Sequence, residues 1–247
     1  MQIQKKNKAG LAVAALFALA AFVPTHAAAA PVSVLAGDIV KLYDGPGTTG
    51  GGEFWADVVG KGVSGTINGS NNDFITFCLE HNETFSSYGQ PLKVAAVNTG
   101  AVNGGVSGQT SLNFDPLSAK TAWLYTQAMT NPGILGYTHT TAKANSLQNA
   151  IWFLEGELGA SFTLAQLNTL DSQAKTWVDA ALASSWTTIG NVRVLNLLKK
   201  DGAGNYTLNS QDQIYIMPVP EPETYAMLLA GLGLMGFVAR RRRNRAL

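Results

Sequence analysis

The sequence predicts an α+β fold, in which a β-rich body, built as a barrel or a sandwich, carries a helical insertion and is followed by a C-terminal transmembrane helix. Short β-rich segments between glycine-rich turns fill the first half of the chain, and stretches with helical periodicity come next. β character then returns before the last apolar run. Runs of strands followed by runs of helices are typical of this class. A length of 247 residues allows one large domain or two small ones.

The first half is expected to be mostly β. Three segments have strand character: Val32–Tyr43, Phe54–Val59 and Asp73–Leu79. Glycine-rich segments separate them, and we expect loops at Asp44–Gly52 and Asn98–Ser111. The pair Asn68-Gly69 favours a tight hairpin turn.

Two helices are predicted next. The first covers Leu117–Met129, with Asp115-Pro116 as its N-cap and first residue, and it ends at Asn131-Pro132-Gly133. The second is expected to start near Asn145 and to end near Gly156, because apolar residues recur in it at helical spacing. Those residues are Ala144, Leu147, Ile151 and Leu154.

A third helix is predicted to start at Thr163, which forms a capping box with Gln166, and to continue to Ala181. β character returns after it. The expected elements are a strand at Asn191–Leu198, a turn at Asp201–Asn205 and a strand at Gln213–Met217.

Charge is distributed unevenly along the chain. The net charge is only +1, but the stretch from Pro31 to Met217 holds nine basic and fourteen acidic residues. The remaining basic residues flank the two terminal apolar runs: Lys5, Lys6, Lys8, Arg240, Arg241, Arg242, Arg243 and Arg245. An acidic middle argues against binding nucleic acid, which requires clustered basic charge.

The N-terminus has the organisation of a secretory signal. Its basic start is followed by the apolar run Leu11–Val23 and by the small residues of Thr25–Ala30. The apolar run is too short for a membrane anchor. We therefore expect residues 1–30 to direct export through the Sec machinery, with cleavage between Ala27 and Ala30.

The C-terminus combines a Pro-Glu-Pro motif, the apolar stretch Tyr225–Ala239 and the cluster Arg240–Arg243. A helix of 15 residues would span about 22 Å, against about 30 Å for the bilayer core, and flanking arginines can snorkel to its surface. The arginine cluster places this end on the cytoplasmic side of the inner membrane.

These residues resemble the PEP-CTERM sorting signal of Gram-negative bacteria. Pro220, Glu221 and Pro222 supply the motif, and Arg240–Arg243 close the pattern. The resemblance implies recognition by an exosortase in the inner membrane, removal of the tail, and delivery to the cell surface or extracellular matrix. The expected domains are therefore a signal peptide at 1–30, a globular region at 31–217 and a sorting tail at 218–247.

Cys78 is the only cysteine of this exported chain, so no intramolecular disulfide is possible. It is an inert buried thiol, half of an intermolecular disulfide, or a reactive group. Strand alternation puts Cys78 on the same face as Thr76 and opposite Phe77 and Leu79. Neither face is plainly polar, so the pattern leaves burial of the thiol open.

Two local motifs favour a reactive cysteine. Phe77-Cys78-Leu79-Glu80 lies on an expected strand, and Leu147-Gln148-Asn149-Ala150-Ile151-Trp152 lies on an expected helix about seventy residues later. Together with Ala122-Trp123-Leu124-Tyr125, they resemble the thioester domains of Gram-positive surface adhesins. Leu147 stands where that family has threonine, and Leu79-Glu80 stands where Ile-Asp is more usual. The resemblance covers roughly Phe74 to Trp152.

The resemblance implies an internal crosslink. The Cys78 thiolate attacks the side-chain amide carbon of Gln148, and ammonia leaves. An amine on a partner, such as a lysine, then displaces the sulfur and forms a stable amide between the two molecules. Such a protein acts once, so it is not an enzyme, and it needs no cofactor.

This chemistry requires close geometry, donors for the oxyanion and exclusion of water. We expect Gln148 in the first turn of its helix, near free N–H groups and the positive end of the dipole. Trp152, one turn further on, would cover the bond, with Phe77 and Trp123 as further shielding residues. Alternatively, both tryptophans are ordinary core residues and Gln148 is a solvated helix residue.

Glu80 and His81 are candidates for proton transfer, although they precede a polar turn, which favours solvent-facing positions for both. With His139 as the one other histidine of the mature chain, a histidine-rich metal site is not expected. The pair Glu155 and Glu157 reads as a solvated helix end.

The glycine pattern from Gly45 to Gly50 lacks a following helix signal, so it reads as a loop rather than a dinucleotide site. The alternative function is a non-reactive structural protein of the extracellular matrix or biofilm, in which Cys78 is merely buried. A third interpretation, a secreted hydrolase, would need carboxylates clustered in a cleft.

Overall fold

The computed structural model describes residues 32–48, 51–61, 73–84, 87–105, 113–218, 228–233 and 235. The predicted signal peptide, the Asn68-Gly69 turn and the sorting residues Pro220–Pro222 and Arg240–Arg243 lie outside these ranges. The expected transmembrane stretch is described only at 228–233 and 235, which are helical. Within the described ranges, no helix is both long and apolar enough to cross a membrane.

The main sheet consists of six antiparallel strands in the order β3-β2-β1-β4-β7-β8. A second sheet contains two short strands, β5 and β6. The strand bounds are β1 Ile39–Thr48, β2 Gly51–Val58, β3 Phe74–Thr76, β4 Pro91–Asn98, β5 Gly100–Val102, β6 Phe114–Pro116, β7 Val192–Lys200 and β8 Tyr206–Ile216. The α+β class predicted from the sequence is confirmed.

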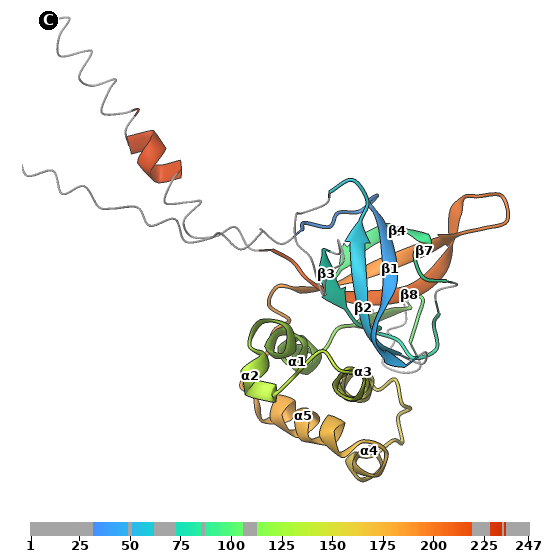
Figure 1. Ribbon diagram of the computed structural model, residues 1–247, viewed down its shortest axis with the longest axis vertical. Helices are drawn as coiled ribbons and strands as arrows, with labels where there is room; N and C mark the ends of the chain where they lie inside the picture. Colours follow the sequence, from blue (N-terminus) through green and yellow to red (C-terminus); the bar gives the residue numbers. More distant parts are fainter. Residues whose placement is uncertain are drawn as a thin grey trace, which may run out of the picture.

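The main sheet curls until its two edge strands meet (Figure 1). The segment after β3 bonds to β8: the Leu79 N–H donates to the Asp212 carbonyl at 3.1 Å, and the Ile214 N–H donates to the Phe77 carbonyl at 3.1 Å. Cys78 lies between them in a bridge with Gln213. Joining the edges satisfies backbone groups that an open sheet would leave unpaired.

The inside of the curled sheet is filled by alternating apolar residues. In β4, Leu92 and Val94 are buried while Lys93 between them is exposed, which is the period of two expected of a half-buried strand. The largest buried members of this core are Leu42, Leu92, Leu195, Leu197 and Tyr215.

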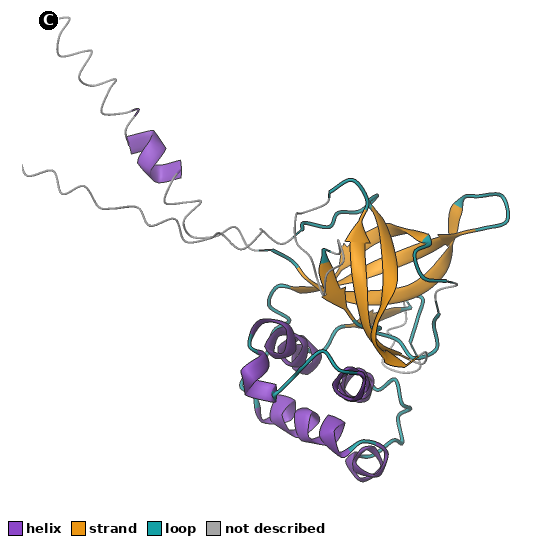
Figure 2. Ribbon diagram, viewed as in Figure 1, coloured by secondary structure: helices purple, strands orange, loops and turns teal. Residues whose placement is uncertain are grey.

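A helical layer lies against one end of the curled sheet (Figure 2). Its elements are α1 Ala119–Thr130, α2 Pro132–Leu135, α3 Thr141–Glu155, α4 Leu164–Leu170 and α5 Ser172–Ala183. A second core joins this layer to the sheet, because Phe77 and Ile214 pack there with helical residues such as Ile151 and Trp177. The helix α3 lies beside β1 and β2 (Figure 1).

Three helix predictions are corrected. The first helix is capped by Ser118, whose hydroxyl accepts from the Thr121 N–H at 3.0 Å, whereas Asp115-Pro116 belongs to β6. The second helix starts at Thr141, a full turn before Asn145. The third is two helices, because Asp171 ends α4 and its side chain caps α5. The predicted capping box of Thr163 and Gln166 is present.

Several strand predictions had the wrong bounds, and some strands were not predicted; the strand expected at Asp73–Leu79 is regular only as β3. Asp44–Gly52, expected as a loop, contributes to the paired ends of β1 and β2, and residues 32–38 precede β1 rather than belonging to it. The strands β4 and β5 were not predicted. The last strand begins at Tyr206, seven residues before Gln213.

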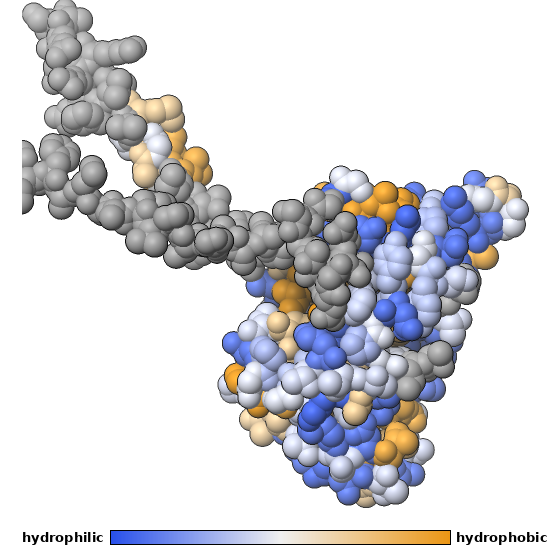
Figure 3. Space-filling view, in the orientation of Figure 1, coloured by the Kyte–Doolittle hydropathy of each residue, from blue (hydrophilic) through white to orange (hydrophobic). Residues whose placement is uncertain are grey.

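The face of the molecule seen in Figure 3 is largely hydrophilic, with apolar residues in small separate patches. This agrees with the acid-rich composition of the middle of the chain and gives no broad apolar surface on that side.

Candidate functional site

Cys78 lies in the segment of residues 77–80, here called the closing segment because it pairs with β8 and closes the curled sheet. Only 5% of Cys78 is exposed. Its neighbours in sequence, Phe77 and Leu79, point into the core shared with the helices. Cys78 itself packs with Phe54 and Trp152 in a separate small apolar cluster. Both faces of this segment are therefore buried, which answers the question that the sequence pattern left open.

Gln148 brings its carboxamide from α3 directly to Cys78. The amide oxygen Oε1 accepts from the Cys78 N–H at 3.0 Å, and Nε2 donates to the Cys78 carbonyl at 2.8 Å. The Gly52 N–H also points at Oε1, at 3.5 Å. The carboxamide thus pairs with the Cys78 peptide as a neighbouring strand would. The residue Gln148 is 1% exposed. Two residues that are 70 positions apart in the chain share one buried site.

The interior of α3, rather than its first turn, carries Gln148. Because the helix starts at Thr141, the N–H groups around Gln148 are already used within the helix. The expected donors at a helix N-terminus are replaced by two strand N–H groups, those of Cys78 and Gly52. This corrects the predicted source of the donors while leaving two donors aimed at the same oxygen.

Glycine at position 51 lets α3 approach β2. A Cβ added to Gly51 would lie 2.5 Å from Cη2 of Trp152 and 2.7 Å from Cγ of Gln148. The backbone φ of +147° also favours glycine there. The glycine-rich segment that looked like a plain loop is therefore the surface against which the glutamine and the tryptophan pack.

The sulfur of Cys78 receives one side-chain hydrogen bond, from Nε2 of Gln213 at 3.7 Å. Burial raises the pKa of the Cys78 thiol to about 12; the bond from Gln213 works against this rise, and the nearby Glu80 adds to it. The thiol is therefore protonated at neutral pH, and Gln213 is the one group seen to favour negative charge on sulfur.

The expected shielding residues divide into two groups. Trp152 lies at the site, 7% exposed, and its ring meets the His81 ring edge to face at a centroid distance of 4.5 Å. Phe77 and Trp123 instead pack in the helical core. Phe54, which the sequence analysis did not single out, takes their place beside Cys78.

Of the two candidates for proton transfer, Glu80 is fully buried beside Glu83 and Asp212 and is near enough to raise the pKa of the Cys78 thiol, whereas His81 is exposed. The prediction of a solvent-facing position is therefore wrong for Glu80. The His81 N–H donates to Glu157 at 2.9 Å. The expectation that Glu155 and Glu157 are solvated is wrong, because they are 8% and 1% exposed.

Among the residues that sequence reasoning missed are Gly51, Gly52, Phe54 and Gln213. Phe54 opens a predicted strand, so side-chain alternation along that strand could have marked it as a buried residue. Gln213 carries no local signal, since its role depends on the pairing of β8 with the Cys78 segment.

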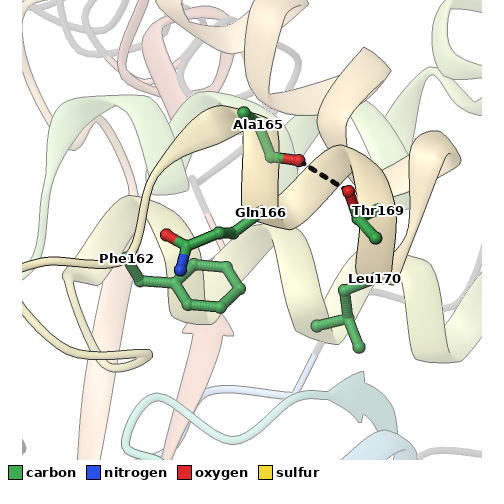
Figure 4. A pocket seen from close by; sticks show the side chains of 5 residues that line it. All are labelled: Phe162, Ala165, Gln166, Thr169 and Leu170. Atoms are coloured by element: carbon green, nitrogen blue, oxygen red, sulfur yellow. Dashed lines mark hydrogen bonds between the residues drawn. The ribbon is translucent and has the colours of Figure 1, made fainter.

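A separate shallow hollow lies on α4 and the turn before it (Figure 4). Phe162, Gln166 and the exposed Leu170 line it, and the Thr169 hydroxyl donates to the Ala165 carbonyl within the helix at 3.1 Å. None of the predicted site residues lines this hollow.

Comparison with known families gives one match. Residues 218–243 match the model of the PEP-CTERM protein-sorting motif. The chain carries a PEP-CTERM signal. It is therefore an exported protein that an exosortase processes and that is associated with the cell surface. The comparisons with curated proteins and with solved structures gave no match.

Proposed function

We propose that this PEP-CTERM protein attaches covalently to amine-bearing partners at the cell surface through a thioester between Cys78 and Gln148. The observation that carries the proposal is the pair of hydrogen bonds between the Gln148 carboxamide and the Cys78 peptide. These bonds hold the amide carbon beside the residue that bears the nucleophile. Each molecule would act once, so the proposal is of a binding protein rather than an enzyme.

The reaction balances without a cofactor. The Cys78 sulfur forms a bond to Cδ of Gln148, and the bond from Cδ to Nε2 breaks. The thiol proton passes to the departing nitrogen, which leaves as ammonia. A partner amine later attacks the same carbon, forms an amide and releases Cys78 as a thiol. A high thiol pKa opposes the first attack, and the bond from Gln213 offsets part of that barrier.

The groups around the carbonyl suit the intermediate. Negative charge develops on Oε1 during attack, where the N–H groups of Cys78 and Gly52 lie at 3.0 and 3.5 Å. Backbone donors fixed in a water-poor site are an effective way to stabilise an oxyanion. The longer contact would shorten as charge builds on the oxygen.

The same packing keeps water from a thioester. Phe54, Cys78 and Trp152 are each less than a tenth exposed. Exclusion of water slows hydrolysis of a reactive acyl group. An incoming amine would have to displace the Trp152 ring, which the exposed His81 ring contacts from outside.

Intact-mass measurement tests the proposal. Protein exported by its native host should be lighter than its sequence by one ammonia molecule, and treatment with methylamine should add the mass of methylamine to that form. Cys78→Ala and Gln148→Glu should both abolish the ammonia loss.

The matched control is Gln127→Asn, which changes another buried glutamine on α1, and it should keep the ammonia loss. An unmodified wild-type mass together with a thiol that reacts once the chain is unfolded would refute the thioester.

A non-reactive structural protein of the extracellular matrix or biofilm is the second candidate. The hydrogen bonds that favour the thioester also satisfy the buried peptide groups of Cys78. Gln148 would then connect α3 to the sheet without any reaction. In that case Cys78→Ala costs stability only and leaves cell-surface attachment unchanged.

We infer the export and sorting route of the protein from its N-terminal signal and its C-terminal sorting motif. Residues 1–30 would engage the Sec machinery, and the tail would hold the protein transiently in the inner membrane of a Gram-negative bacterium. The exosortase would then release the body to the cell surface or extracellular matrix. Comparing the mass of the C-terminus in cells with and without the exosortase would test this order.

A further inference from the structure

Three carboxylates meet where the closing segment crosses β8. Carboxylate oxygens of Glu80, Glu83 and Asp212 all lie within 4.8 Å of one another. Glu80 is fully buried, Asp212 is 2% exposed and Glu83 is half-buried. Like charges this close and this poorly solvated repel strongly, so the cluster requires either protons or a cation.

The Glu80 carboxylate has no hydrogen-bond donor in the described part of the chain unless Glu83 carries a proton. Both of its oxygens are buried, and the one hydrogen bond seen at Glu80 goes from Nε2 of Gln211 to its backbone carbonyl. One oxygen of Glu83 is in the same state. Asp212 differs, because the Leu197 N–H and the Asn196 side chain donate to it at 2.9 and 2.7 Å. A buried charged group without partners is rare in native proteins and points to a missing ligand.

A glycine closes the remaining side of the cluster. A Cβ on Gly104 would overlap the Glu80 carboxylate, so the backbone of this loop lies directly against it. The Asn82 side chain holds the same loop by donating to the Gly105 carbonyl at 3.0 Å. The carboxylates are thus enclosed by the closing segment, β8 and the loop that follows β5.

We propose that Glu80, Glu83 and Asp212 bind a calcium ion that fastens the closing segment to β8. Calcium takes oxygen ligands in flexible geometry, whereas magnesium demands a strict octahedron. Three ionised carboxylates with one dication leave a net charge of −1 in place of −3. The acidic neighbour Glu157 adds further negative charge, and Lys199 near Glu83 supplies the opposite sign.

The alternative occupant of the cluster is the proton. Burial is the main cause that raises the pKa of Glu80 to about 11 and that of Asp212 to about 8. Without a cation, these groups would therefore hold protons at neutral pH. The two occupants predict different behaviour. A cluster that binds calcium is stabilised by added calcium, whereas a cluster that only binds protons is stabilised by lower pH and not by calcium.

The site would act on Cys78 through the backbone. Glu80 is two residues beyond Cys78, and Asp212 immediately precedes Gln213, which donates to the Cys78 sulfur. A cation that joins Glu80 to Asp212 would therefore fix the backbone next to Cys78 and next to Gln213. The proposal does not depend on the thioester, since a thermal shift is measured whether or not the crosslink forms.

Thermal unfolding of the full chain in detergent tests the site. After treatment with EDTA and removal of the chelator, 10 mM calcium chloride should raise Tm by about 2–6 °C, for a dissociation constant of about 1 mM. The same concentration of magnesium should raise it less. Equal stabilisation by magnesium would overturn the assignment to calcium.

Glu80→Gln and Glu83→Gln should each remove most of the calcium-dependent shift. These neutral replacements keep the side-chain shape and reduce repulsion, so both variants should fold. Glu155→Gln is the matched control, because it neutralises a buried carboxylate outside the cluster and should keep the wild-type shift. No calcium-dependent shift in the wild-type protein, or a full shift in both cluster variants, would overturn the proposal.

Discussion

At the scale of single residues, Gln148 is the side chain on which the site depends. Its carboxamide satisfies the N–H and carbonyl of Cys78 at the same time, so it occupies the position that a neighbouring strand would fill. A buried peptide left without these partners would cost about 1–3 kcal/mol per group. This structural role exists whether or not the sulfur attacks the amide.

Gly51→Ala should disturb this site more than its size suggests. The new methyl group would collide with Trp152 and Gln148, and the backbone φ of +147° disfavours any side chain. We expect the free energy of unfolding to fall by about 1–3 kcal/mol and the fraction of ammonia-depleted protein to fall with it. Urea denaturation and intact mass measure the two effects.

Gly202→Ala is the control for this change. A Cβ at Gly202 meets nothing within 4 Å, and the residue lies in an exposed turn. Stability should stay within about 0.5 kcal/mol of the wild type. A Gly51→Ala protein that matched this control would contradict the close packing of α3 on β2.

At the scale of elements, Asp171 fixes where α3, α4 and α5 meet. One carboxylate oxygen accepts from the Ala174 N–H at 2.9 Å and from the Ser146 hydroxyl at 3.0 Å. The other accepts from the Asn149 side chain at 3.1 Å. The residue therefore caps α5 and also ties it to the part of α3 that carries Gln148.

Asp171→Ala should lower the free energy of unfolding by at least about 1–2 kcal/mol, the usual cost of a lost N-cap. Asp171→Asn should recover much of that loss, since an amide oxygen also caps helices. Asp179→Ala, which removes only an exposed ion pair with Lys175, should cost about 0.3–0.5 kcal/mol. Chemical denaturation monitored by circular dichroism compares the three, and equal losses for Asp171→Ala and Asp179→Ala would contradict the capping role.

The elements also show which parts of the fold the sequence could predict. Start and stop signals located α1, helical periodicity located α3, and the capping box located the start of α4. The break at Asp171 was missed because the apolar pattern continues through it. The second half of β1 was missed because glycine carries no apolar signal. Local patterns describe single elements, whereas pairings such as Cys78 with Gln213 depend on the whole sheet.

At the scale of the whole molecule, two apolar cores meet along the closing segment, and acidic groups are buried at this junction. Phe77 and Leu79 belong to the core of the helical layer, while Tyr215 on β8 belongs to the core inside the curled sheet. A further buried carboxylate, that of Glu155, lies at the C-terminal end of α3, where it accepts from the Ser118 N–H at 3.2 Å. Buried carboxylates at a junction make the stability of the whole body depend on pH.

Glu155 is one of the buried carboxylates that set the direction of that dependence. Burial raises its pKa from 4.5 to about 7, against hydrogen bonds from Thr121 and Ser118 that lower it and the nearby Asp115 that adds to the rise. Between these two values the folded protein holds a proton that the unfolded chain has lost. Stability therefore falls as pH rises through this window, with a limiting slope of about 1.4 kcal/mol per pH unit for one group.

Glu155→Gln should remove this contribution, because the amide carries no charge at any pH in the window. Urea denaturation at steps between pH 4.5 and 7 should give a flatter profile for the variant than for the wild type. Asp179→Asn, which changes an exposed carboxylate on α5, should leave the wild-type slope unchanged. Asp115 and Asp212, whose pKa values burial also raises, should leave a smaller slope in the variant. A Glu155→Gln slope equal to that of the wild type would show that Glu155 is ionised in the folded protein and that its hydrogen bonds outweigh its burial.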